Sequence, residues 1–194
     1  VLGLNFHKIT WGEINSWSSI AKHTDNLIIF GGINPKNSQV SMGGSTEHDV
    51  AEHFKNFKRL QKNMVSISPQ QDDSPKETNW LPIIPGTDMA LMLAIAYVLE
   101  TENLADQTFL DTHSSGYHVF KKYFLGEDGR SAKTPEWAST ETGIDASQIR
   151  DLARNMASGR TLICVSWSLQ RARYGEHPFW MACVLAAMLG QLGL

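Results

Sequence analysis

Small and polar residues follow four short apolar segments of the sequence, and their types suit contacts with a nucleotide-like ligand. Amide and carboxylate groups can read a base or a ribose, and small residues let a ligand approach the main chain. An arginine can bind a phosphate or a carboxylate. The residues of interest after the four segments are, in order, Asn34, Ser38 and Gln39; Ser68 and Gln70; Asp88; and Trp167, Ser168, Gln170 and Arg171.

Two common phosphate-binding patterns are missing from the sequence. The first apolar segment ends at Gly31-Gly32, but the GxGxxG pattern of a standard dinucleotide fold is absent, and no GxxxxGK[ST] pattern occurs. Two adjacent glycines after a strand are commonly just a turn. The sequence therefore argues against a standard NAD fingerprint and against a P-loop.

Two of the polar groups have structural explanations that compete with ligand binding. Thr87 or Asp88 before an apolar segment is a natural helix N-cap, whereas a carboxylate at a helix N-terminus could instead accept from a guanine edge or a ribose. Trp167 and Arg171 could contact a ligand, or they could be a core tryptophan beside a surface arginine. Both alternatives stay open at this point.

Metal and thiol chemistry have little support. Cys164 and Cys183 both lie in apolar runs, so we expect buried structural thiols. Neither belongs to a CxxC pair, and the seven histidines are scattered without metal-ligand spacing. We therefore expect no metal ligand in this chain.

The elements that would position these residues alternate between strands and helices. Short apolar runs predict strands over 27–30, 64–68, 80–85 and 161–166, the first buried on both faces and the third at an edge because of its prolines. Helices are predicted over 48–63, 89–100, 145–158 and 177–189, and Asp145 with Gln148 resembles a capping box. This alternation predicts one doubly wound, mainly parallel, Rossmann-like α/β domain over 1–194, with a helical insertion over 103–143.

Composition supports a folded domain and limits its partners. Of 194 residues, 42 % are hydrophobic and 19 % are charged, which argues against disorder and against a coiled coil. The net charge is −3 with scattered basic residues, so no nucleic-acid footprint is expected. The best apolar stretch, Met181–Leu189, is too short to span a bilayer.

The order and spacing of several motifs carry a resemblance to a known family. They are Asn34-Pro35, Ile67-Ser68-Pro69, Gly86-Thr87-Asp88, Ser166 to Arg171, Gly175 to Trp180 and Ala186 to Gln191. Together they resemble the dimethyl sulfoxide reductase family of molybdenum enzymes, nearest the biotin sulfoxide and trimethylamine N-oxide reductase branches. Both ends of the sequence read as internal to a longer chain.

The resemblance implies a cofactor and a role for each candidate residue. Family members hold molybdenum with two molybdopterin guanine dinucleotides and reduce S-oxides or N-oxides by oxygen-atom transfer. The segment that this chain resembles would cradle one dinucleotide, and the family's metal-coordinating serine would lie outside it. By position, Asn34, Ser38 and Gln39 would approach phosphates and pterin; Ile67, Ser68 and Asp88 would face the guanosine; and Trp167, Ser168, Gln170 and Arg171 would lie near the pterin and the substrate funnel.

One departure and one alternative accompany this expectation. Many relatives have Ile-Asp-Pro where this chain has Ile67-Ser68-Pro69, so the ribose contact could pass to a neighbour such as Gln70. The alternative function is a stand-alone nucleotide-binding module without redox activity. The resemblance favours a cytoplasmic location, and the exported branch makes the periplasm the alternative.

Overall fold

A four-stranded parallel sheet organises the protein. The structure, a computed structural model, describes residues 15–38 and 48–192, so the candidate Gln39 lies outside the described residues. The strands are β1 (Asn26–Phe30), β2 (Asn63–Ser68), β3 (Asn79–Pro82) and β4 (Thr161–Val165), in the order β3-β2-β1-β4. Every neighbouring pair is parallel. The predicted α/β class and parallel sheet are confirmed.

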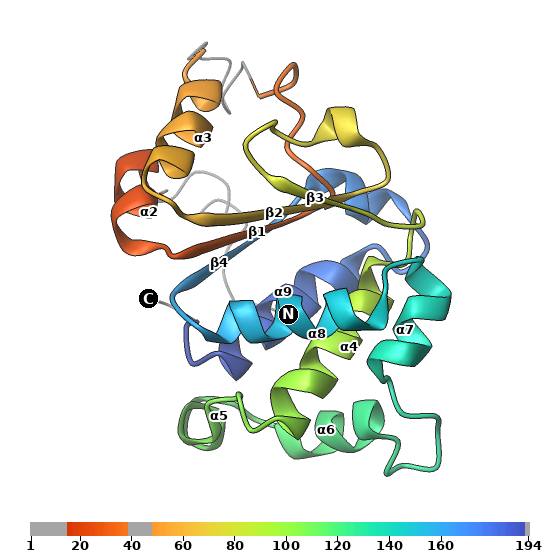
Figure 1. Cartoon of the computed structure of the whole chain (residues 1–194). Coiled ribbons are helices and arrows are strands. Elements are labelled where there is room, and N and C mark those ends of the chain that lie inside the picture. Colours follow the sequence, from red (N-terminus) through yellow and green to blue (C-terminus); the bar gives the residue numbers. More distant parts are fainter. Residues whose placement is uncertain (1–14, 39–47, 193–194) are drawn as a thin grey trace.

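Helices cover both faces of this sheet (Figure 1). The helices are α2 (Trp17–His23), α3 (Val50–Arg59), α4 (Asp88–Thr101), α5 (Gln107–His113), α6 (Tyr117–Leu125), α7 (Pro135–Thr142), α8 (Ala146–Ala157) and α9 (Glu176–Met188), with 3₁₀ turns η1 (Gln71–Asp73) and η2 (Trp167–Arg171). Along β1, Ile28 and Phe30 point into one core with α4, α8 and α9, while Leu27 and Ile29 point into a second core with α2 and α3. Alternate side chains of one strand thus enter opposite layers, as the doubly wound prediction requires.

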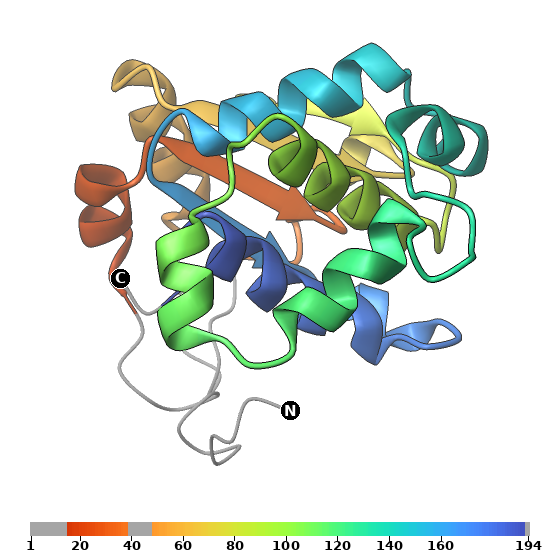
Figure 2. The same cartoon turned by 90° about the horizontal axis from the view of Figure 1, so that it is seen from below.

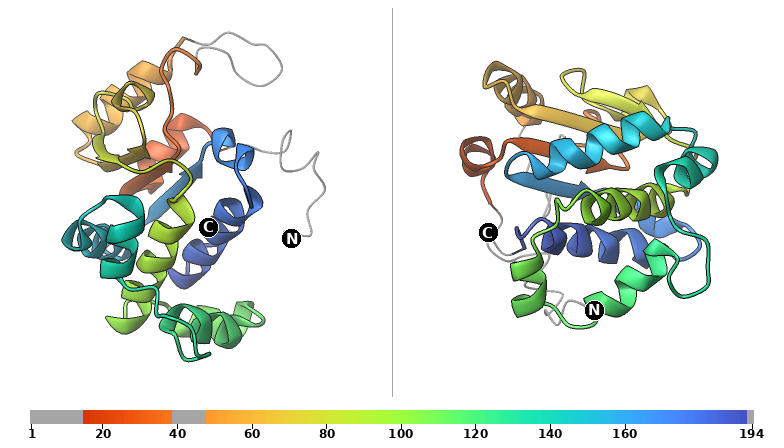
Figure 3. Two further views of the ribbon diagram at one scale, coloured as in Figure 1. Left: turned by 90° about the vertical axis from the view of Figure 1, so that its right-hand side faces the viewer. Right: turned by 60° about the horizontal axis from the view of Figure 1, so that its bottom comes forward.

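The segment predicted as a helical insertion contains α5, α6 and α7. Figures 2 and 3 show α5 and α6 on the outer side of the layer formed by α4 and α9. Glu100 near the end of α4 anchors them: its carboxylate accepts from the Tyr117 hydroxyl at 2.6 Å and from Gln107 Nε2 at 3.0 Å, and it pairs with Lys121. Whether 103–143 is an insertion within a single domain stays a prediction.

A row of side-chain hydrogen bonds fixes the register of three strands at their amino ends. Asn63 Nδ2 donates to Asn26 Oδ1 at 3.1 Å, and Asn26 Nδ2 donates to Thr161 Oγ1 at 3.1 Å. The Thr161 hydroxyl in turn donates to the Met156 carbonyl at 2.7 Å. Because Asn26 is buried, these bonds satisfy polar groups that would otherwise be costly.

Several details differ from the sequence-based expectations. The third strand lies at the sheet edge as predicted but ends at Pro82. Asp145 precedes α8 but makes no side-chain cap bond, so the predicted capping box is wrong. The short helix α2 was not predicted. Within the described ranges, β4 has one strand neighbour, and because it is an edge strand its residues are half-buried rather than core.

The two cysteines are also less enclosed than expected. Cys164 on β4 and Cys183 on α9 are both half-buried residues. Burial nevertheless raises the pKa of the Cys164 thiol to about 11, and it raises the pKa of Cys183 as well. None of the helices in the described ranges is long and apolar enough to cross a bilayer.

Candidate functional site

The order of the sheet reverses between β1 and β4, and this is where parallel α/β folds bind ligands. β1 is followed by Gly31 and Gly32, whose φ angles of +86° and +74° lie in the left-handed region that favours glycine. A β-carbon on Gly31 would lie 2.8 Å from Ser166 Cβ, and one on Gly32 would lie 2.5 Å from the Asp73 carbonyl oxygen. The two glycines therefore let the end of β1 contact the loops after both neighbouring strands.

Asn34 is held by its surroundings on both sides of its amide. Its Nδ2 donates to Asp73 Oδ1 at 2.9 Å, and its Oδ1 accepts from the main-chain N–H of Lys36 at 2.9 Å. Ser38, another candidate, donates its hydroxyl to the Pro35 carbonyl at 3.3 Å. These contacts organise residues 34–38 of the segment that follows β1.

The candidates at the end of β2 point mainly inward. Ile67 is fully buried in the core shared with α4. Ser68 is also fully buried, and its hydroxyl donates to the Gln70 carbonyl at 2.7 Å and lies 3.2 Å from Ser74 Oγ. Ser74 Oγ lies 2.7 Å from Ser66 Oγ, so three hydroxyls form one buried cluster. Gln70, which also follows β2, is an exposed residue.

Asp88 differs from the other candidates because it is buried and one oxygen of its carboxyl group has no hydrogen-bond partner among the described residues. The residue is 4 % exposed at the first turn of α4, directly after β3 and its following turn. Its Oδ1 has no hydrogen-bond partner among the described residues. Burial raises the pKa of this carboxyl, although a hydrogen bond to its own main chain acts in the opposite direction. Thr87 occupies the N-cap position without a side-chain cap bond, so capping does not account for the motif.

The residues after β4 form the exposed turn η2. Trp167 is 62 % exposed, so the alternative of a core tryptophan is wrong. Gln170 and Arg171 are exposed as well, while the Ser168 hydroxyl donates to Ser166 Oγ at 3.1 Å. The apolar anchor of this turn is Leu169, which packs against the core.

Two features of the loops at the strand ends could not be predicted from the sequence. Asp73 joins the loops after β1 and β2, but nothing in the sequence distinguishes it from its neighbour Asp72. Tyr174, with φ at +59°, stacks on His177 at 5.2 Å between ring centroids and lies beneath the Arg173 guanidinium at 4.9 Å. A tyrosine in the left-handed region gives no sequence signal comparable to a glycine.

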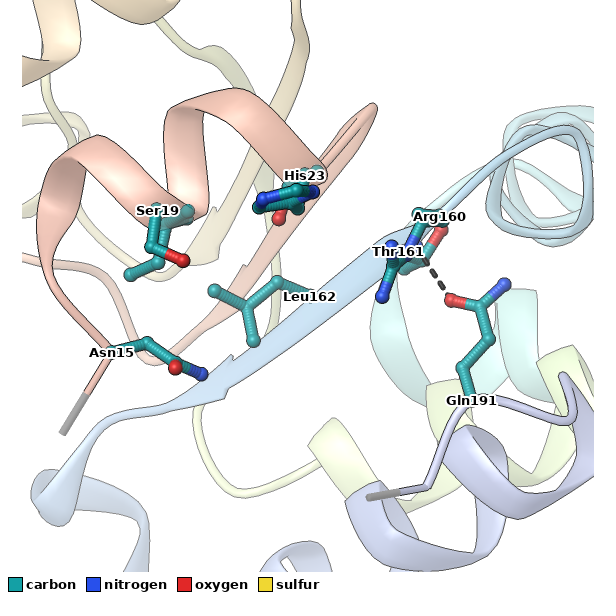
Figure 4. Close-up of a pocket in the computed structure, with 9 residues that line it drawn as sticks. Asn15, Ser19, His23, Arg160, Thr161, Leu162 and Gln191 are labelled. Carbon is teal, nitrogen blue, oxygen red and sulfur yellow. Dashed lines mark hydrogen bonds between the residues drawn. The ribbon is translucent and has the colours of Figure 1, made fainter. Parts of the chain in front are cut away.

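Two hollows lie away from this edge. One, of about 310 Å³, sits at the amino ends of β1 and β4, where Thr161 N donates to Gln191 Oε1 at 2.7 Å (Figure 4). The other, of about 660 Å³, lies between α6 and α9 and is lined largely by apolar side chains such as Val119, Phe120 and Trp180. In residues 15–38 and 48–192, no group of three or more His, Cys, Asp or Glu side chains could hold a metal ion.

The carboxyl ends of the strands therefore offer main-chain groups of a glycine-containing loop, a buried carboxyl group with one unpartnered oxygen, and an exposed turn carrying tryptophan, glutamine and arginine. Such groups bind and orient a ligand with polar and phosphate portions. The structure brings the loops of Asn34 and Ser68 together through Asp73, and it brings Gly31 against the η2 turn.

Comparisons with known proteins agree on one family. The sequence model described as molybdopterin oxidoreductase matches residues 5–194. Biotin sulfoxide reductase from Cereibacter sphaeroides is 39 % identical over 184 residues, which cover 94 % of this chain and 25 % of that protein. Trimethylamine-N-oxide reductase from Vibrio parahaemolyticus is 40 % identical over 190 residues, covering 95 % and 23 %.

A solved structure shows the same fold. Acetylene hydratase from Pelobacter acetylenicus superposes with a TM-score of 0.70 at 22 % identity, covering 96 % of this chain and 24 % of that one. The chain thus spans about a quarter of the length of the curated relatives it matches.

Proposed function

Because the chain belongs to the molybdopterin oxidoreductase family, we propose that the loops at the carboxyl ends of its strands bind the guanosine diphosphate portion of a molybdopterin guanine dinucleotide. The family implies a molybdenum–molybdopterin cofactor. The dinucleotide form and the residues that contact it are our proposal. When bound, this cofactor supplies two-electron oxygen-atom transfer.

The observation that carries the proposal is the Asp88 carboxylate. A buried carboxylate oxygen without a donor costs folding free energy, which a ligand donor would recover. Guanine presents adjacent N–H donors on its Watson–Crick edge, whereas adenine presents a donor beside an acceptor. A carboxylate therefore favours guanine over adenine.

The remaining candidates would share the rest of the nucleotide. The loop 31–38 follows β1, and the main-chain N–H groups of Gly32, Ile33 and Asn34, which have no acceptor among the described residues, would donate to the phosphates. The Ser68 hydroxyl is turned inward, so we assign the ribose contact to exposed Gln70 rather than to Ser68. Trp167, Gln170 and Arg171 are exposed where the strand order reverses, and all three would face the pterin. Trp167 and Arg171 would also face the substrate.

The direct test measures the melting temperature of this chain with GDP and with ADP. We expect GDP to raise Tm and ADP to leave it unchanged, because ligands that bind the folded state stabilise it by mass action. Asp88→Ala should abolish the shift with GDP, while the exposed α8 carboxylate variant Asp151→Ala should keep it. A preference for ADP would instead favour the alternative, a stand-alone nucleotide-binding module.

The activity of the whole protein is a further part of the proposal. The names of the relatives favour reduction of an S-oxide, such as biotin or methionine sulfoxide, or of trimethylamine N-oxide. We expect molybdenum in the longer protein by elemental analysis, and we expect this chain alone not to oxidise a reduced viologen dye with either class of oxide. Turnover by the chain alone would contradict the assignment of the metal ligand to another segment.

We also propose a cytoplasmic location, with the periplasm as the alternative. Reading the start of the gene for a twin-arginine signal tests this directly. Finding such a signal would overturn the cytoplasmic assignment without affecting the nucleotide-binding proposal.

A further inference from the structure

Asp73 holds together two loops that the cleft needs in a fixed arrangement. On one side, its Oδ1 accepts from Asn34 Nδ2 at 2.9 Å across 39 residues of sequence. On the other side, its main-chain N–H donates to the Gln70 carbonyl at 3.2 Å, within the loop that follows β2. The carboxylate of Asp73 therefore ties the loop after β1 to the loop after β2.

The contact extends beyond one hydrogen bond. Asn34 Oδ1 accepts from Lys36 N, and the Asn34 carbonyl accepts from the N–H groups of Asn37 and Ser38 at 3.0 and 3.1 Å. Asn34 thus accepts hydrogen bonds from three of the four residues that follow it. Gly32, two residues earlier, packs so closely on the Asp73 main chain that no side chain fits between them. Holding Asn34 in place fixes the direction of the N–H groups around it.

The other side of this contact is equally anchored. Ser74, next to Asp73, shares the buried hydroxyl cluster with Ser66 and Ser68. Trp80 on the edge strand donates its indole N–H to the Ser68 carbonyl at 3.0 Å. Asp73 is therefore attached to the sheet, and residues 32–38 after β1 are attached to Asp73.

We propose that Asp73 is a positioning residue for the nucleotide site, acting by holding Asn34 so that the loop 31–38 is ordered before the ligand arrives. The proposal rests on the proposed function for its ligand. Asp73 acts by accepting a hydrogen bond from Asn34, and an uncharged side-chain oxygen could accept the same bond. A loop that is ordered before the ligand arrives loses less conformational entropy on binding, and the ligand therefore binds more tightly.

The test compares four variants of this chain, with GDP as the probe in calorimetric titrations. Asp73→Ala and Asn34→Ala should each weaken GDP binding by about tenfold, the size expected for one hydrogen bond to a charged group. Asp73→Asn should restore most of the affinity, because its amide oxygen still accepts from Asn34. Asp72→Ala removes a neighbouring exposed carboxylate and should leave the affinity unchanged.

Hydrogen exchange supplies a readout that does not depend on the ligand. In the free protein, Asp73→Ala should speed exchange of the main-chain amides over 32–38, with no change in α4, and Asp73→Asn should not speed it.

A double variant completes the titrations with GDP. The variant that lacks both the Asn34 and the Asp73 side chains should lose no more affinity for GDP than either single variant.

Three results would overturn the positioning role: unchanged exchange in Asp73→Ala, additive losses in the double variant, or equal weakening by Asp72→Ala. If the unmodified chain does not bind GDP at all, the proposed function fails instead. The exchange rates and a double-mutant cycle on unfolding free energies then decide the positioning role by themselves.

Discussion

Gly32 lies against the main chain of Asp73, so that a β-carbon at Gly32 would sit 2.5 Å from the Asp73 carbonyl oxygen. The two residues belong to loops that follow neighbouring parallel strands, β1 and β2. Their contact closes the gap between those loops at the edge of the sheet where we place the ligand. Both the positive φ of Gly32 and the absence of a side chain are needed for it.

Gly32→Ala should therefore destabilise the protein strongly, by about 3 kcal/mol or more, because steric overlap with main chain adds to left-handed strain. Gly129→Ala is the matched control: its φ is +86°, yet nothing lies within 4 Å of its β-carbon position. It should cost only about 1 kcal/mol. Urea unfolding measures both, and equal losses would mean that the Gly32–Asp73 contact relaxes freely.

The pH dependence of stability should carry the signature of Asp88. Burial raises its pKa above the usual 3.8, so the folded protein keeps a proton that the unfolded chain releases. The contribution of Asp88 to stability is therefore complete below pH 3.8 and is lost as pH rises through the raised pKa. The unfolding free energy of the unmodified chain minus that of Asp88→Asn should therefore decrease as pH rises over this window.

Urea unfolding at several pH values between about 3 and 8 measures this difference. Asp72→Asn, which removes an exposed carboxylate, is measured alongside as the control variant. A difference that stays constant across the range would show that Asp88 is solvated in solution, and it would remove the main support for a ligand donor at this position.

Tyr117→Phe should loosen α6 from α4. The Tyr117 hydroxyl donates to Glu100, and burial together with that carboxylate raises the pKa of Tyr117, which keeps it a donor at neutral pH. Losing a hydrogen bond to a charged group should cost about 1–2 kcal/mol. Tyr123→Phe on the same helix is the control, because its hydroxyl makes no hydrogen bond within the described residues. Hydrogen exchange in α6 distinguishes local loosening from global loss.

The thiols should be slow to alkylate in the folded protein. A pKa of about 11 for Cys164 instead of 9.0 lowers its thiolate population near neutral pH by roughly a hundredfold. Cys183 is half-buried and its pKa is also raised. Iodoacetamide at pH 7.5 should label both thiols quickly in urea and slowly without it. Rapid labelling of Cys164 in the native protein would show that β4 opens in solution.

Much of this fold could be predicted because its signals are local. The apolar run 27–30 gave a strand buried on both faces, and the prolines near 82 placed β3 at an edge, since proline cannot donate to a ladder. The site was harder, because its contacts join distant residues. Asn34 and Asp73 are 39 positions apart, and only the parallel pairing of β1 with β2 brings them together.

Exposure was harder to predict than the strands themselves. The apolar sequence of β4 is typical of a core strand, but one side of it has no strand neighbour within the described ranges. The sequence left open whether Ser68 or Gln70 would contact a ribose, and the Ser68 hydroxyl donates to the Gln70 carbonyl. The direction of a side chain at a strand end depends on such local competition, which residue type alone does not reveal.

The pairing of β1 with β4 has a consequence for how the protein is made. Asn26 and Thr161, partners in the register, are 135 residues apart. A ribosome emits β1 long before β4, so the nascent chain carries β1 with one flank bare while more than half the sequence is still to come. The pairing of β1 with β4 therefore forms only after β4 has been synthesised, and a ligand held by the loops after both strands would bind after that step.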